Sequence, residues 1–124
     1  MDGSVIQHKE LAASGRWGEM PFAHQMANIG SEVFRAAKWK DAGKTDRALR
    51  AADRALELLD LTVSSRQQKA LELRELLRLR ELLCDYFYGD NLYSQSSSAL
   101  NKYFEPFSMK AAELRRLSAT GELG

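Results

Sequence analysis

Four polar side chains of the types that bind anions recur every three or four positions early in the chain: His24, Asn28, Ser31 and Arg35. This spacing places them on one side of a helix. An imidazole, an amide, a hydroxyl and a guanidinium can together donate hydrogen bonds to a phosphate or a carboxylate. The pattern predicts a polar ligand face on this helix. A hydrated helix surface, or a polar seam against another chain, is the alternative that the sequence leaves open.

A second set of side chains is basic and could follow a phosphate backbone: Arg35, Lys38, Arg47, Arg50 and Arg54. From residue 35 to residue 80 the chain has 12 basic and 7 acidic residues, although the net charge of the whole chain is only +1. Three acidic residues, Asp46, Asp53 and Glu57, are spaced to offset the arginines along a helix. Because a basic excess remains, accessory binding of RNA or DNA by these residues is the alternative function that the sequence suggests.

No residue pattern predicts catalysis or a metal site. Zinc sites need several Cys or His ligands at close spacing, whereas the chain has one cysteine, Cys84, and two distant histidines, His8 and His24. Cys84 lies among leucines, so we expect a small core side chain rather than a nucleophile beside a base. A glycine-rich phosphate loop is also lacking. We therefore expect no enzymatic activity, no metal and no cofactor.

The composition is that of one globular domain. The chain has 124 residues, of which 44% are hydrophobic and 28% are charged. A single cysteine cannot form an intrachain disulfide, which fits a reducing compartment. The first 13 residues lack the basic start and apolar run of a signal peptide, and no run approaches the roughly 18 apolar residues that span a membrane. We expect a cytoplasmic protein with no membrane partner.

The elements that must position these residues are predicted to be helices. Leu, Ala, Glu, Arg and Lys dominate the composition, and Val and Ile are scarce. Helices are expected at about 21–42, 45–63, 65–88 and 98–117. Gly43 should end the first helix in a left-handed conformation, and Gly89 should end the third. Short connections make the first three helices antiparallel neighbours, so an up-and-down four-helix bundle is the economical fold.

The expected helix positions divide the chain into a flexible N-terminal arm at 1–19, a bundle at 20–117 and a tail at 118–124. Trp17 is expected to tuck back from the arm onto the bundle. Pro106 should kink or split the fourth helix, because it removes one backbone hydrogen bond and crowds the preceding turn. Gly30 costs about 1 kcal/mol relative to alanine inside a helix, which indicates close packing of a neighbouring helix there.

The predicted third helix carries apolar side chains on two sides. One side has Leu73, Leu76, Leu77, Leu83, Cys84 and Phe87, and the other has Leu71, Leu79, Leu82 and Tyr86. An apolar face that one small monomer cannot cover marks an interface. We therefore predict a non-enzymatic interaction module, a homo-oligomer or a protein that docks a partner through this second face. Its predicted residues are Leu71, Leu79, Leu82 and Tyr86, with Leu58 and Leu61 of the second helix. Cover by the fourth helix or the arm is the alternative.

Two segments, PFAHQMANIGSE at 21–32 and DYFYGDN at 85–91, resemble signatures of a bacterial protein group. The plan of the chain resembles small bacterial four-helix-bundle proteins that are related in shape to HEPN domains. Some of those proteins accompany nucleotidyltransferases or RNA-processing systems. The catalytic HEPN pattern is an arginine followed a few residues later by a histidine, and Arg74, Arg78 and Arg80 are followed by none. The resemblance therefore implies a non-catalytic partner at most.

Overall fold

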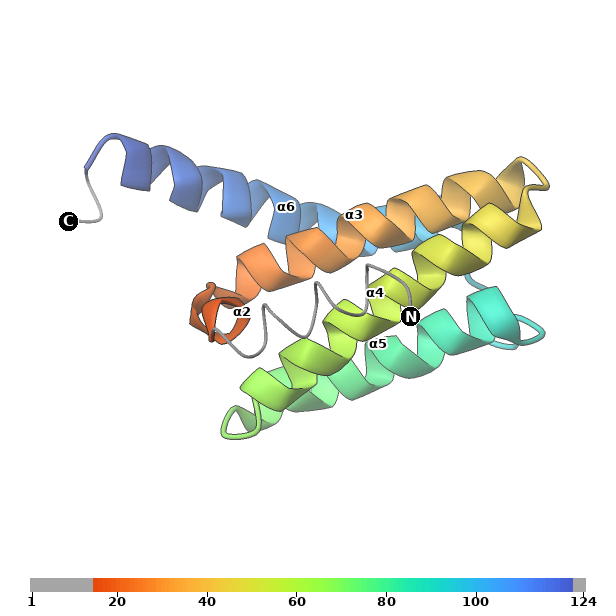
Figure 1. The fold of residues 1–124 in the computed structure, drawn as a ribbon, viewed down its shortest axis with the longest axis horizontal. Coiled ribbons are helices and arrows are strands. Elements are labelled where there is room, and N and C mark those ends of the chain that lie inside the picture. Colours follow the sequence, from red (N-terminus) through yellow and green to blue (C-terminus); the bar gives the residue numbers. More distant parts are fainter. Residues whose placement is uncertain (1–14, 122–124) are drawn as a thin grey trace.

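The computed structural model describes residues 15–121, and within that range the chain forms helices and no strand. The five helices are α2 (Arg16–Glu19), α3 (Phe22–Asp41), α4 (Thr45–Ser65), α5 (Ala70–Tyr88) and α6 (Ser97–Ala119) (Figure 1). The predicted all-helical fold is confirmed. Most of the predicted N-terminal arm and the last three residues of the predicted tail lie outside the described residues.

Helix α3 is the element on which the others are assembled. It packs along α4 and along α6, and α4 in turn carries α5 and α2 (Figure 1). Helices α5 and α6, both fully described, do not pack along their lengths. They meet through side chains, as where the Tyr86 hydroxyl lies 3.4 Å from Ser97 Oγ. A closed up-and-down four-helix bundle therefore stays a prediction. None of the helices within residues 15–121 is both long and apolar enough to cross a membrane.

The long helices share one apolar core, and the short helix α2 belongs to it. The largest fully buried apolar side chains are Met26, Ile29, Val33, Leu59, Leu76, Leu79, Leu83 and Leu100. Trp17 of α2 is 5% exposed, and its indole N–H donates to Thr62 Oγ1 of α4 at 3.0 Å. The expected tucking of Trp17 is confirmed. The packed domain consequently includes Arg16–Glu19, which the sequence assigned to a flexible arm.

The turn before α4 agrees with the prediction from the sequence, and the turn after α4 differs from it. Gly43 has φ of +76°, the left-handed stop that was predicted there. The third helix begins at Ala70, later than predicted, because residues 66–68 form a turn. Arg66 joins this turn to the segment between α2 and α3 and to the first turns of α3. Its Nη2 donates to the Met20 carbonyl oxygen at 2.9 Å, and its Nε donates to Gln25 Oε1 at 3.0 Å.

Helix α6 is continuous across Pro106, so the predicted split of this helix is wrong. Proline cannot donate a hydrogen bond to the carbonyl of residue 102. Both Pro106 and Lys102 lie on the exposed side of the helix, where water can satisfy that carbonyl. A serine cap starts the helix, because Ser96 Oγ accepts a hydrogen bond from the Ala99 N–H at 3.1 Å.

Close packing at Gly30 joins α3 to α6. A Cβ added at Gly30 would lie 2.8 Å from Cγ and 2.9 Å from Cδ1 of Phe104, inside the normal carbon–carbon contact distance of about 3.5–4.0 Å. The phenyl group of Phe104 therefore occupies the space that any other residue at position 30 would fill. The packing role predicted for Gly30 is confirmed.

Candidate functional site

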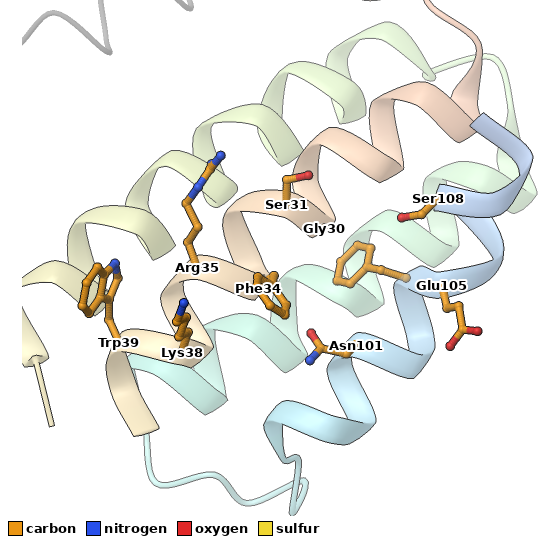
Figure 2. Close-up of a pocket in the computed structure, with 10 residues that line it drawn as sticks. Gly30, Ser31, Phe34, Arg35, Lys38, Trp39, Asn101, Glu105 and Ser108 are labelled. Carbon is orange, nitrogen blue, oxygen red and sulfur yellow. The ribbon is translucent and has the colours of Figure 1, made fainter. Parts of the chain in front are cut away.

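A groove with a volume of about 720 Å³ runs between the outer sides of α3 and α6 (Figure 2). Helix α3 contributes Ser31, Phe34, Arg35, Lys38 and Trp39 to its lining, together with Gly30. Helix α6 contributes Asn101, Phe104, Glu105 and Ser108. The groove thus has three aromatic residues in its lining, cations from α3, and neutral or acidic groups from α6.

The aromatic rings of this groove differ in how they are held. Phe104 is buried and rests against Gly30, so its ring is fixed by the contact between α3 and α6. Phe34 projects from the middle of α3 and is 52% exposed. Trp39 is half-buried at the end of the groove nearest α4. The site therefore offers one fixed ring and two rings with accessible surface.

Arginines of α3 and α4 are tied together by shared partners. Arg35 Nη1 lies 3.1 Å from Glu32 Oε1, and Arg54 Nε lies 3.3 Å from Glu32 Oε2. The antiparallel pairing of the two helices about Gly43 places Glu32 opposite Arg54 and brings these guanidinium groups to one carboxylate. One glutamate consequently holds two arginines from different helices side by side.

The same pairing places Arg47 against Trp39. The guanidinium carbon of Arg47 lies 4.9 Å from the centroid of the Trp39 ring, which is cation–π distance. Arg47 and Arg50 also line one shallow depression of about 440 Å³ at the start of α4. Lys38 and Arg35 line the groove with Trp39.

The structure gives a partner or a groove position to each of the five residues predicted as a nucleic-acid face. Arg35 and Arg54 share Glu32, Arg47 packs on Trp39, Lys38 lines the groove with Arg35 and Trp39, and Arg50 lines the depression with Arg47. We refer to these five residues as the basic face. The sequence predicted them as one candidate face, and the antiparallel pairing of α3 and α4 brings Arg35 and Arg54 to one carboxylate and Arg47 to Trp39.

Carboxylates near the basic face have partners on other helices. The segment from residue 35 to residue 54 has seven basic and three acidic residues. The Asp53 carboxylate accepts a hydrogen bond from the Tyr88 hydroxyl of α5, and the Asp41 carboxylate accepts one from Ser97 of α6 at 2.6 Å. Burial, followed by the hydrogen bond to Asp53 and the charge of that carboxylate, raises the pKa of Tyr88. Two of the three carboxylates of this segment thus accept hydrogen bonds from hydroxyl groups of α5 and α6, while Glu32 of α3 pairs with two arginines of the basic face.

The four residues of the polar ligand face predicted on α3 do not all line the groove. Ser31 and Arg35 line the groove, but His24 and Asn28 do not. His24 donates from Nε2 to the Ala111 carbonyl oxygen of α6 at 3.2 Å. The Asn28 amide donates to the His24 carbonyl oxygen at 2.9 Å. These two side chains bond to α6 and to their own helix and do not line the groove, so a four-residue ligand face stays a prediction.

The predicted interface on the third helix is largely inside the chain. Leu79 is 2% exposed and Tyr86 is 6% exposed, and Leu58 of α4 is buried as well. The buried stripe of α5 is Leu76, Leu79, Leu83 and Tyr86, which draws members from both of the predicted sides. Its spacing of three and four residues is that of one ordinary core face. The division into two opposed faces was therefore wrong, and these three residues form no exposed patch.

The less buried residues of that predicted face on α5, Leu71 and Leu82, line a second groove, of about 390 Å³, between α5 and α6. Leu71 is 80% exposed, while Leu82 and, on α4, Leu61 are half-buried. Tyr103 of α6 lies in this groove near Glu75. Burial and the Glu75 charge raise the pKa of the Tyr103 hydroxyl.

Sequence reasoning missed the aromatic and α6 parts of the larger groove. Trp39 and Arg47 each stand four positions from Gly43, so a tight antiparallel turn was a signal that they would meet. Asn101 and Ser108 gave no such signal, because their position depends on how α6 lies across α3. Among residues 15–121, no group of three or more His, Cys, Asp or Glu side chains could hold a metal ion.

Comparisons with protein-family models, with curated proteins and with solved structures found no match.

Proposed function

We propose that this chain binds nucleic acid, with the phosphate backbone lying along the basic face of α3 and α4. The observation that carries the proposal is the set of contacts that joins its cations: Arg54 and Arg35 share Glu32, and Arg47 stacks on Trp39. Cations at fixed positions on one surface are what a repeating phosphate backbone requires.

The pairing with Glu32 leaves the arginines able to bind. A guanidinium has five N–H donors, and only one nitrogen of Arg35 and one of Arg54 are engaged by the carboxylate. The remaining donors can bind a phosphate in the two-bond geometry that arginine favours. Glu32 also limits the conformations of both side chains, which reduces the entropy lost on binding.

Net charge sets the expected strength of this binding. Because the whole chain carries only +1, attraction is confined to the basic face, and we expect sequence-independent affinity in the range of roughly 1–100 μM at physiological salt. A test is fluorescence anisotropy with a labelled RNA at low and at physiological salt. Loss of binding with rising salt supports the proposal, and no binding at low salt ends it.

A matched pair of variants localises the binding surface. Arg47→Gln combined with Arg50→Gln removes two charges from the basic face. Arg115→Gln combined with Arg116→Gln removes two exposed charges near the end of α6, and neither residue lines either groove. The first double variant should bind RNA more weakly and the second should bind as the unaltered chain does. Equal losses in both would mean that binding follows net charge rather than this surface.

A second candidate function is association through α5, with another copy of the chain or with a protein partner. The observation that favours it is the exposed Leu71 at the mouth of the groove between α5 and α6, with Leu82 beside it. An exposed leucine beside a largely apolar groove is typical of contact surfaces. Light scattering on the purified chain tests self-association, and a monomer at every concentration removes that form of the candidate.

A further inference from the structure

We infer that the nucleic acid bound by this chain is single-stranded and that the groove between α3 and α6 receives one of its unstacked bases. This inference rests on the proposed function, and it names the class of ligand.

Exposed aromatic surface lies directly beside the cations. Phe34 is 52% exposed and shares the groove with Arg35 and Lys38. Proteins that bind single strands combine a basic track with aromatic side chains on which bases stack. A base inside a duplex cannot reach such a ring, since both of its faces are covered by neighbouring bases. An accessible ring among phosphate-binding cations therefore favours an unpaired strand.

The groove has the dimensions and rigidity for this role. Its volume of about 720 Å³ falls within the range of about 300–1,000 Å³ that is usual for sites that bind small molecules. Its base is preformed, because Phe104 is held in the space left by Gly30. A nucleotide entering the groove would meet a surface that already has its bound shape, which lowers the cost of binding.

The charge of the two walls orients the nucleotide. Arg35 and Lys38 are on the α3 wall, whereas the α6 wall has no cation among the residues that line it. Figure 2 shows the Asn101 amide directed from α6 toward Phe34, with Glu105 directed away. Phosphate is therefore expected on the α3 side and the base edge on the α6 side. An amide both donates and accepts hydrogen bonds, so Asn101 can contact any base and gives no strict sequence preference.

The test compares single-stranded and duplex RNA of the same length as anisotropy probes. The unaltered chain should bind the single strand more tightly than the duplex. Phe34→Ala should weaken single-strand binding about tenfold, in line with the effect of removing one stacking ring, and leave duplex binding within about twofold. Phe34→Trp should retain single-strand binding, because it keeps a ring at this position.

Met109→Ala is the matched control, since Met109 is an exposed apolar side chain on α6 that does not line the groove. Thermal unfolding of each variant shows whether it is folded, and Phe34→Leu gives a second variant without a ring that keeps the apolar bulk. If both probes bind and neither ring-removing variant affects the single strand selectively, the inference is overturned and the proposed function stands. If neither probe binds at low salt, both are overturned.

Discussion

Replacing Gly30 with alanine tests the packing that forms the base of the groove. The new Cβ would lie 2.8 Å from Cγ, 2.9 Å from Cδ1 and 3.0 Å from Cβ of Phe104. Two of these three atoms lie at or next to the attachment of the ring, so a rotation of the phenyl group alone does not clear them. The contact can be relieved only if α6 moves away from α3 or if Phe104 adopts another rotamer.

Two opposing effects determine how much Gly30→Ala changes the free energy of unfolding. Alanine favours the helix over glycine by about 1 kcal/mol. Overpacking a core position costs about 1–3 kcal/mol, and the gap here must open by several tenths of an ångström. Packing wins on these figures, so we expect Gly30→Ala to lower the free energy of unfolding by about 1 kcal/mol.

Chemical denaturation followed by circular dichroism measures this change. Gly18→Ala is the matched control, because a Cβ at Gly18 would meet Ser65 Cβ at an ordinary distance of 3.5 Å. That variant should be as stable as the unaltered chain or slightly more stable. If Gly30→Ala proves equally stabilising, the close approach of Phe104 to α3 is refuted, and with it the fixed base of the groove.

Three further predictions concern other parts of the chain. Arg47→Gln with Arg50→Gln should make the negative slope of log K against log salt for single-stranded RNA less steep by about 1.4, at roughly 0.7 for each phosphate that the variant no longer neutralises. An unchanged slope in the anisotropy titration would place the bound phosphates elsewhere on the molecule. Trp17→Phe removes the 3.0 Å hydrogen bond to Thr62 and should lower the free energy of unfolding in denaturant by about 1–2 kcal/mol, so stability equal to that of the unaltered chain would mean that this hydrogen bond does not stabilise the packing of α2. Leu71→Lys should leave stability within about 0.5 kcal/mol, because the side chain is exposed, and it should abolish any dimer seen by light scattering if α5 mediates association.

The sequence alone determined the features that depend on neighbouring residues. The all-helical class follows from composition, and the left-handed stop at Gly43 follows from the freedom of glycine at positive φ. The packing role of Gly30 was also readable, since a glycine inside a helix needs a reason that outweighs its cost. These outcomes are set within a few residues of chain, so they need no knowledge of how the helices are arranged.

The tertiary structure decided which sides of those helices are buried and which of their side chains meet. Leu79 and Tyr86 are core residues, whereas the sequence analysis placed them on an outer face, because α5 packs on α4 through the stripe that contains them. The His24 imidazole binds the Ala111 carbonyl oxygen because α6 lies against α3 at that point. Trp39 and Arg47 became partners through the pairing of two helices. Helical periodicity determines which side chains of one helix share a side. Only packing determines which of those sides faces the rest of the molecule.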